Sequence, residues 1–162
     1  MCSYPGGMGV MGLLDQHVIF TLDDQQYSLP LSNIERIVPA AYVTLLPKAP
    51  DIVTGIINIQ GQVVPVINLR RRFQLPERLL DPADQFIIAH TLQRTVVLVV
   101  DAVIGVINIP NRALVHQADI LPSLEHVAGA VKQEDGIILI YDLEACLSID
   151  EERALALALK AA

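Results

Sequence analysis

Apolar residues in this chain fall in short runs separated by turn-forming residues, and Val and Ile dominate the runs. Such runs predict β-strands, because β-branched side chains fit a pleated, half-buried surface. Asp23-Asp24-Gln25 and Gln60-Gly61 separate neighbouring runs and predict the turns of two hairpins. We expect strands over residues 17–22, 26–31, 55–59, 62–67, 85–90, 95–100, 102–109, 130–133 and 136–141.

Helices are predicted to be short or to lie at the end of the chain. Asn68 is placed to cap a helix over residues 69–73, and Asp142 to cap one that ends at Cys146. Ser148 and Glu151 have the spacing of a capping box, which predicts a final helix. Single helical turns are predicted at 51–53 and at 32–38, the latter leading into a strand. Loops are expected over 44–50, 75–84, 91–94 and 111–129.

The order of these elements favours a mainly β fold. Short strands joined by turns, without alternation of strands and helices, are typical of antiparallel barrels or sandwiches. The runs 96–100 and 137–140 are apolar at successive positions. Both faces of these strands are therefore expected to be buried, as between two packed barrels that share a core. Pro65 lacks a backbone N–H, so we expect it at a sheet edge or a bulge.

Three segments are predicted: a flexible tail at residues 1–16, a folded domain at 17–147 and a C-terminal helix at 148–162. The tail is rich in glycine and contains neither Lys nor Arg, so it is not typical of a secretory signal. Polar residues and prolines interrupt the most apolar stretches, which makes them unsuitable for spanning a membrane. We therefore expect a soluble, cytoplasmic protein.

The charge balance argues against nucleic-acid binding. Lys and Arg number 11 against 18 Asp and Glu, for a formal net charge of -7, and an acidic chain repels phosphate backbones. The compact basic run Arg70–Arg72 has two possible interpretations. It is either the solvated face of a short helix, or a small positive patch that contacts phosphate or an acidic partner.

The sequence contains no recognisable metal site. None of the histidines has zinc-ligand spacing, and all are expected at the surface or rim of the fold. Cys2 and Cys146 are too few and too far apart for a disulfide framework or a metal motif, and Cys146 is expected to be a buried, inert thiol. The histidines are His17, His90, His116 and His126.

No catalytic constellation is visible either. Asp101 follows an apolar strand, as the carboxylate of an aspartic protease does, but Ala102-Val103 replaces the hydroxyl-Gly turn of that chemistry. We expect Asp101 to accept hydrogen bonds in a turn, with a hydrolase as the minor alternative. The serines lack the G-x-S-x-G setting of a nucleophile, and no nucleotide-binding glycine loop is present. The sequence thus predicts a protein without catalytic activity and without a metal or cofactor.

The segment Thr54–Arg70, TGIINIQGQVVPVINLR, closely resembles the signature hairpin of CheW-like domains. That signature is roughly G-h-h-N-h-R-G-x-h-h-P-h-h-D-L-R, where h is apolar. The resemblance covers about Val18 to Leu147. It also includes Phe20-Thr21-Leu22, the hairpin at Tyr27, and the segments 34–37, 46–50, 98–103, 127–129 and 138–143.

The resemblance implies two small SH3-like antiparallel β-barrels sharing a core, with short helices and a C-terminal helix. It further implies a non-catalytic adaptor that couples the cytoplasmic tips of chemoreceptors, the methyl-accepting chemotaxis proteins, to the regulatory domain of a CheA-type histidine kinase. Nucleic acid and direct insertion into a membrane are not expected. In such a scaffold a conformational change of the receptor shifts the equilibrium of the kinase.

Three positions depart from the family pattern. Gln60 replaces the usual Arg of the hairpin turn, and Asn68 replaces the usual Asp before Leu-Arg. Before Ile37, Arg36 stands where the family usually has Glu, and Glu35 lies one place earlier. A neutral amide at Gln60 in place of a guanidinium favours an alternative function, a regulatory module that docks a different signalling partner. Such a partner could belong to a pilus-motility or other non-flagellar pathway.

The resemblance also implies which residues contact partners. The positions matching family contacts are Ile34, Arg36, Ile37, Gln60, Val103 and Val106; those matching structural turns are Gly55, Gly61 and Gly129. Plain core packing is the alternative role for each aliphatic residue. For the turn glycines, added bulk is expected to disturb the surface without touching a partner.

Overall fold

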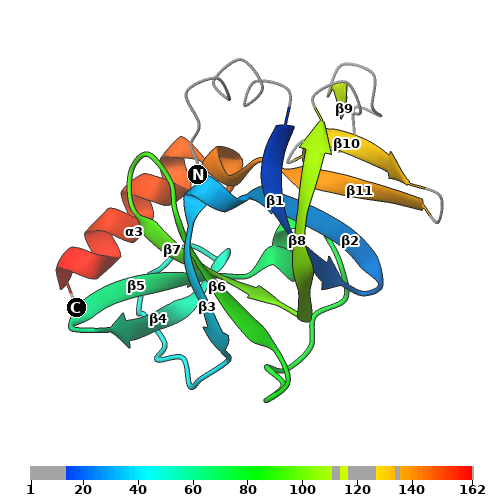
Figure 1. The fold of residues 1–162 in the computed structure, drawn as a ribbon. Coiled ribbons are helices and arrows are strands. Elements are labelled where there is room, and N and C mark those ends of the chain that lie inside the picture. The colour runs from blue at the N-terminus through cyan, green and yellow to red at the C-terminus, as the bar shows by residue number, and fades with distance from the viewer. Residues whose placement is uncertain (1–13, 111–113, 117–126, 134–135, 162) are drawn as a thin grey trace. The chain divides into compact units, whose positions relative to one another are not determined.

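A computed structural model describes residues 14–110, 114–116, 127–133 and 136–161 of the chain. The fold is mainly β, as predicted, and the described residues divide into two compact units. The first unit comprises the residues up to Ser32 and those from Val103 to Asp142, and the second comprises 33–102 and 143–161. Each unit is built around one sheet (Figure 1).

The sheet of the first unit has six strands in the order β8-β1-β2-β11-β10-β9. The predicted hairpin of β1 and β2 is confirmed, with Asp23 and Asp24 at φ 48° and 69° in its turn. Two positive φ values are the geometry that matches the twist of a hairpin. The strands are β1 (Leu14–Leu22), β2 (Gln25–Pro30), β8 (Ala102–Pro110), β9 (Leu114–His116), β10 (Val127–Gln133) and β11 (Gly136–Tyr141).

Apolar side chains and one buried histidine fill the interior of this unit. Phe20 and Tyr27 face each other across the β1–β2 pair and stack with ring centroids 5.7 Å apart. His17 is buried, and its Nδ1 lies 3.3 Å from the hydroxyl of Ser28. The expectation that every histidine lies at the surface or rim is therefore wrong for His17. A core cluster is formed by Ile19, Ile109, Val131, Ile138 and Ile140.

The sheet of the second unit has five strands in the order β3-β6-β7-β5-β4. The predicted β4–β5 hairpin and the strands β6 and β7 are confirmed. Each of the two sheets also contains one parallel pair, β2 with β11 and β5 with β7, beside the expected antiparallel pairs. The strands are β3 (Ile34–Pro39), β4 (Val53–Ile59), β5 (Gln62–Ile67), β6 (Gln85–His90) and β7 (Thr95–Val100), and their core includes Val64, Val66, Phe86, Ile88 and Val97.

Pro65 lies in β5, an interior strand, so the predicted edge position is wrong. Ile56, its partner in β4, exchanges its backbone hydrogen bonds with Thr44, at 2.7 and 2.9 Å, instead of with Pro65. The nitrogen of Pro65 therefore points away from β4, toward β7. Since β7 pairs with β5 only at Val66 and Ile67, the missing N–H of Pro65 interrupts neither ladder.

The helices are short except for the last, as the sequence predicts. Asn68 caps α2 by accepting a hydrogen bond from the backbone N–H of Arg71. At 51–53, where a helical turn is predicted, the chain forms a single turn closed by the N–H of Val53 donating to the carbonyl oxygen of Pro50 at 2.9 Å, and Val53 is also the first residue of β4. The strand β9 lies in the stretch 111–129, which is predicted to be irregular; residues 111–113 and 117–126 of that stretch are outside the described part. Among the described residues, the helices are η1 (Leu31–Asn33), α2 (Leu69–Arg72), η4 (Leu143–Ala145) and α3 (Ile149–Ala161).

The predicted capping box opens α3. The hydroxyl of Ser148 accepts a bond from the N–H of Glu151, whose carboxylate in turn accepts one from the N–H of Ser148, at 3.1 and 2.8 Å. The leucines of this helix do not share one face: Leu155 and Ala158 are buried, whereas Leu157 is exposed. Ion pairs from α3 to α2 and to the β6–β7 turn add to this packing within the second unit.

Glu151 gives this capping box a pH dependence. Partial burial, the largest influence, acts to raise the pKa of Glu151, but hydrogen bonds from Ser148 and the charge of Arg72 outweigh it and lower the pKa below its ordinary 4.5. A carboxyl whose pKa is lower in the folded protein stabilises the fold above its unfolded pKa, and this contribution is lost as the pH falls through the folded value.

Gln at position 151 keeps the acceptor of the capping box but loses the charge that faces Arg72 and the start of the helix. We therefore expect Glu151→Gln to lower the free energy of unfolding at pH 7 by about 1 kcal/mol, the upper end of the value of such a charge. The difference from the native protein should shrink as the pH falls below 4.5 and the native carboxyl becomes protonated. Urea denaturation at pH 7, 4 and 3 measures it, with Asp150→Asn in the same first turn as the control. If the native protein and Glu151→Gln differ in unfolding free energy by the same amount at all three pH values, the carboxylate charge of Glu151 does not stabilise the fold.

Candidate functional site

The turn between β4 and β5 presents Gln60 to solvent, as predicted. Gln60 and Gly61 have φ 51° and 87°, and the N–H of Gly61 donates to Oδ1 of Asn58 at 2.8 Å. No atom lies within 4 Å of the place where a Cβ on Gly61 would sit. Glycine is therefore favoured at position 61 by the backbone conformation rather than by lack of space. The turn holds the exposed Gln60 at the tip of the β4–β5 hairpin.

The predicted contact residues of β3 lie at one edge of the five-stranded sheet. A register shift between Ile34 and Arg36 marks a bulge, and both Glu35 and Arg36 are exposed as a result. The guanidinium of Arg36 lies 3.5 Å from Glu35, whose carboxylate also lies 3.0 Å from Nε2 of His90. Ile34 and Ile37 are half-buried. This edge therefore offers a charged group flanked by partly exposed apolar side chains.

In β8 the alternation of the strand separates the two predicted contact residues. Val103 is half-buried and Val106 is 51% exposed, and residues three apart point to opposite faces of a strand. Ile104, which is 56% exposed, shares the face of Val106 and was missed by sequence reasoning. Residues 102–109 are nearly all apolar, so no alternation in the sequence marked Ile104; its spacing of two from Val106 is what places it on the same face.

The candidate contact residues do not form one set of neighbours along the strands. Ile34, Arg36, Ile37 and Gln60 belong to the second unit, whereas Val106 belongs to the first. Within the second unit, β3 and β4 are the first and last strands of the sheet order. Strand pairing by itself therefore does not place Gln60 beside Arg36.

Two of the three glycines predicted at turns lie inside strands instead. Gly55 is a buried residue of β4, and Gly129 is a residue of β10 next to a register shift. A Cβ on Gly55 would lie 2.2 Å from the carbonyl oxygen of Thr44 and 2.7 Å from Cγ1 of Val43. Gly55 is thus required by the close approach of the neighbouring segment, and Gly61 alone of the three forms a tight turn.

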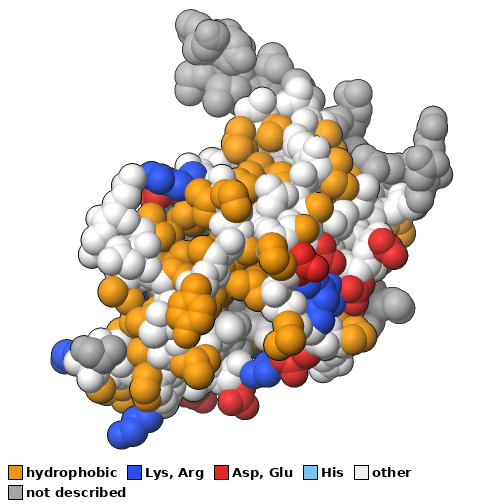
Figure 2. Space-filling view, turned by 90° about the horizontal axis from the view of Figure 1, so that it is seen from below, with side chains coloured by type: hydrophobic (Ala, Val, Ile, Leu, Met, Phe, Trp, Pro, Cys, Tyr) orange, Lys and Arg blue, Asp and Glu red, His pale blue; other side chains and the backbone are white. Residues whose placement is uncertain are grey.

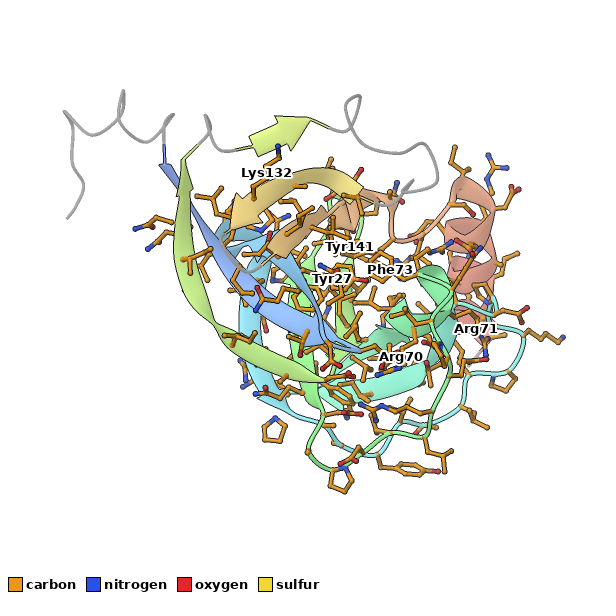
Figure 3. The ribbon with its side chains drawn as sticks, turned by 90° about the vertical axis from the view of Figure 1, so that its right-hand side faces the viewer. Tyr27, Arg70, Arg71, Phe73, Lys132 and Tyr141 are labelled. Atoms are coloured by element: carbon orange, nitrogen blue, oxygen red, sulfur yellow. The ribbon has the colours of Figure 1, made fainter. Side chains whose placement is uncertain are left out.

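The basic run Arg70–Arg72 is not an open positive patch, and of its three residues only Arg71 is exposed to solvent. Arg70 is buried, and its terminal nitrogen lies 2.8 Å from both carboxylate oxygens of Asp101. Arg71 pairs with Glu77 at 2.6 Å, and Arg72 pairs with Glu151. Figure 3 shows Arg70 and Arg71 projecting from α2. Each arginine of the run thus has its own carboxylate, and the run joins separate segments of the second unit.

Asp101 accepts hydrogen bonds from two arginines. Arg78 donates to Asp101 at 2.8 Å and to Asp84 at 2.6 Å, so one guanidinium bridges two carboxylates. The hydrogen bond to Asp84 is the largest influence and raises the pKa of Arg78; burial opposes it and Asp101 adds to it. Aspartic-protease chemistry needs two carboxylates that share one proton. Here each carboxylate instead accepts hydrogen bonds from the guanidinium of Arg78.

This ionic network borders a cavity of about 300 Å³ in the second unit. The apolar part of its wall comes from β5, β7 and the loops that precede β4 and β6. No signal in the sequence pointed to this cavity, because its wall is assembled from five separate segments. The lining residues are Tyr42, Val43, Thr54, Val66, Asn68, Arg70, Arg78, Leu80, Asp84, Val99 and Asp101.

Cys146 has the environment of an unreactive thiol. It is buried, and desolvation raises its pKa to about 12, against the opposing charge of Arg72. The thiolate is the nucleophilic form, so little of it is present at neutral pH. Within the described ranges, no group of three His, Cys, Asp or Glu side chains could hold a metal ion. No helix in that part of the chain is long and apolar enough to cross a membrane.

Comparisons with known proteins agree with the fold and with the hairpin. The family model described as CheW-like domain matches residues 16–151. Chemotaxis protein CheW of Treponema pallidum is 26% identical over 147 residues, which cover 87% of this chain and 86% of that protein. Protein FrzA of Myxococcus xanthus is 28% identical over 120 residues, or 70% of this chain and 71% of that protein.

A solved structure matches most of the chain as well. The crystal structure of the scaffolding protein TtCheW from Thermoanaerobacter tengcongensis superposes with a TM-score of 0.77 at 28% identity, covering 85% of this chain and 94% of that one. The family model spans both compact units and the hairpin that carries Gln60. The chain belongs to the CheW-like domain family.

Proposed function

We propose that this protein is a chemotaxis scaffold that couples chemoreceptors to a CheA-type histidine kinase in the cytoplasm and catalyses no reaction. The observation that carries the proposal is the similarity to a solved scaffolding protein over 94% of that protein's chain. The kinase is contacted through its regulatory domain, and the receptor through its cytoplasmic tip. The similarity of the chain to several chemotaxis proteins named CheW supports the pathway.

The described surface is suited to contacts with proteins. In the first unit, the exposed aliphatic side chains of β8, Ile104 and Val106, are apolar groups that a partner can cover. In the second unit, the exposed amide of Gln60 and guanidinium of Arg36 can donate hydrogen bonds to a partner. A scaffold of this kind acts through its affinities. If it binds one receptor conformation more tightly than the other, receptor and kinase states become linked.

A second candidate is a CheW-like module that docks a different signalling protein, for example in a pilus-motility pathway. The observation in its favour is Gln60, which puts a neutral amide at the exposed tip of the signature hairpin. An arginine there would offer a fixed charge and five donors, so a partner selected by Gln60 need not present a carboxylate.

Calorimetric titration with the regulatory domain of the CheA-type kinase from the same organism distinguishes the two candidates. We expect the native protein to bind with a Kd on the order of micromolar or tighter, as a specific signalling contact requires. Gln60→Arg should be measured beside it. The matched control is Gln62→Arg, which adds the same charge at an exposed position two residues away.

The outcomes separate clearly. Binding by the native protein supports the coupler and makes Gln60 a tolerated difference. Binding only after Gln60→Arg, and not after Gln62→Arg, favours the module with another partner. Absence of binding by all three proteins, with the far-UV circular dichroism of a folded β protein, would exclude the kinase as the partner. A turnover screen at acid pH with Asp101→Asn as the control tests the hydrolase alternative, which requires Asp101-dependent activity.

A further inference from the structure

The cavity of the second unit has an apolar interior. Val66 and Val99 come from the adjacent strands β5 and β7, and Val43 and Leu80 from two loops. Its volume of about 300 Å³ is at the lower end of the range of ligand pockets, roughly 300–1,000 Å³. A space of this size suits one large side chain rather than an extended ligand.

The charged part of the wall is internally neutralised. Arg70 and Arg78 supply two positive charges, and Asp84 and Asp101 supply two negative charges, all joined at 2.6 to 2.8 Å. A charged ligand would need to compete for one of these groups and would leave its former partner uncompensated, which is costly in a partly buried site. The network therefore selects an uncharged occupant.

The mouth of the cavity continues into exposed apolar surface. Tyr42 and Leu80 line the cavity and are 86% and 41% exposed, and Leu79, beside Leu80 in the chain, is 91% exposed. On the face drawn in Figure 2, a group of acidic and basic side chains lies beside patches of apolar surface. Apolar surface that extends beyond a small cavity is typical of contact with a protein rather than with a small molecule.

We propose that this cavity binds one uncharged, apolar side chain of a partner protein, of the size of leucine, methionine or phenylalanine. Tyr42 and Leu79 then cover the apolar surface around that side chain, as the rim of an interface does around an anchor residue. The inference rests on the proposed function only in that a scaffold has protein partners. It adds an anchor site that is separate from Gln60, Arg36 and Val106.

The test is an NMR titration of the full-length 15N-labelled protein with capped amino acids. N-acetyl-leucine amide and N-acetyl-phenylalanine amide should produce saturable shifts at the amides of Val66 and Val99, with a Kd on the order of millimolar, as expected for ligands of this size. N-acetyl-aspartate amide should produce none there. Leu80→Trp should fill the mouth and weaken binding at least about tenfold, roughly 1.4 kcal/mol.

Leu92→Trp is the matched control, because Leu92 is an exposed loop leucine of the same unit that does not line the cavity. Thr54→Trp blocks the cavity from β4 and replaces Leu80→Trp if that variant does not fold. Equal binding by the blocked and control variants, or equal binding of the aspartate amide, would overturn the proposal. Much tighter binding of 3-methylbutan-1-ol than of the leucine amide would overturn it in favour of a small-molecule ligand. Neither receptor nor kinase is present, so the result is independent of the calorimetry above.

Discussion

Gly55→Ala is expected to lower the free energy of unfolding by about 3 kcal/mol, at the upper end of the cost of overpacking. The added Cβ would lie 2.2 Å from the carbonyl oxygen of Thr44. That oxygen accepts a hydrogen bond from the backbone N–H of Ile56, and the backbone oxygen of Ile56 accepts one from the N–H of Thr44. The two bonds form a β-bridge between Thr44 and Ile56. Because backbone atoms rather than a flexible side chain obstruct the methyl group, the bridge between the two segments must open to admit it.

Gly105→Ala provides the matched control. Gly105 is also a strand glycine, but nothing lies within 4 Å of its Cβ position and its φ is not positive. Alanine there should be neutral or stabilising, by up to about 1 kcal/mol, because it restricts the unfolded chain. Urea denaturation monitored by circular dichroism measures both variants. If Gly55→Ala and Gly105→Ala were equally stable, the backbone of Thr44 would not lie in close contact with Gly55.

Asp101→Asn is expected to cost about 3 kcal/mol, the lower part of the range for breaking a buried ion pair. The variant removes the carboxylate that pairs with the buried Arg70 and with Arg78. We place the value at the lower part of the range because the side chain of Asp101 is 25% exposed, so water screens part of the charge. Chemical denaturation at neutral pH measures the loss.

A double-mutant cycle identifies the pair as the cause of that loss. Arg70→Met combined with Asp101→Leu should be less destabilising than the sum of the single changes, because it leaves neither member of the pair as an uncompensated charge. Asp51→Asn is the control for the loss of an acidic charge, since Asp51 is exposed and lies outside the network. Additive effects in the cycle would contradict a direct energetic coupling between Arg70 and Asp101.

The hairpins and the helix caps could be predicted from the sequence because they depend on neighbouring residues. Turn residues at 23–25 and 60–61 lie between apolar runs, and their backbone angles follow from local conformational preference. Ser148 with Glu151, and Asn68 with Arg71, form their caps within three residues. The mainly β class follows from the same local signals, and the family follows from the hairpin motif.

Contacts between distant residues were decided only by the tertiary structure. Arg70 pairs with Asp101, 31 residues away, and Arg72 with Glu151, 79 residues away. A run of three arginines therefore looks like a positive patch in the sequence and is neutralised in the fold. Contacts between distant residues also determine the interior position of Pro65, the parallel strand pairs and the cavity. Periodicity shows which face of a strand is apolar. Which strands lie beside it, and how deeply each charged side chain is buried, depend on how the whole chain packs.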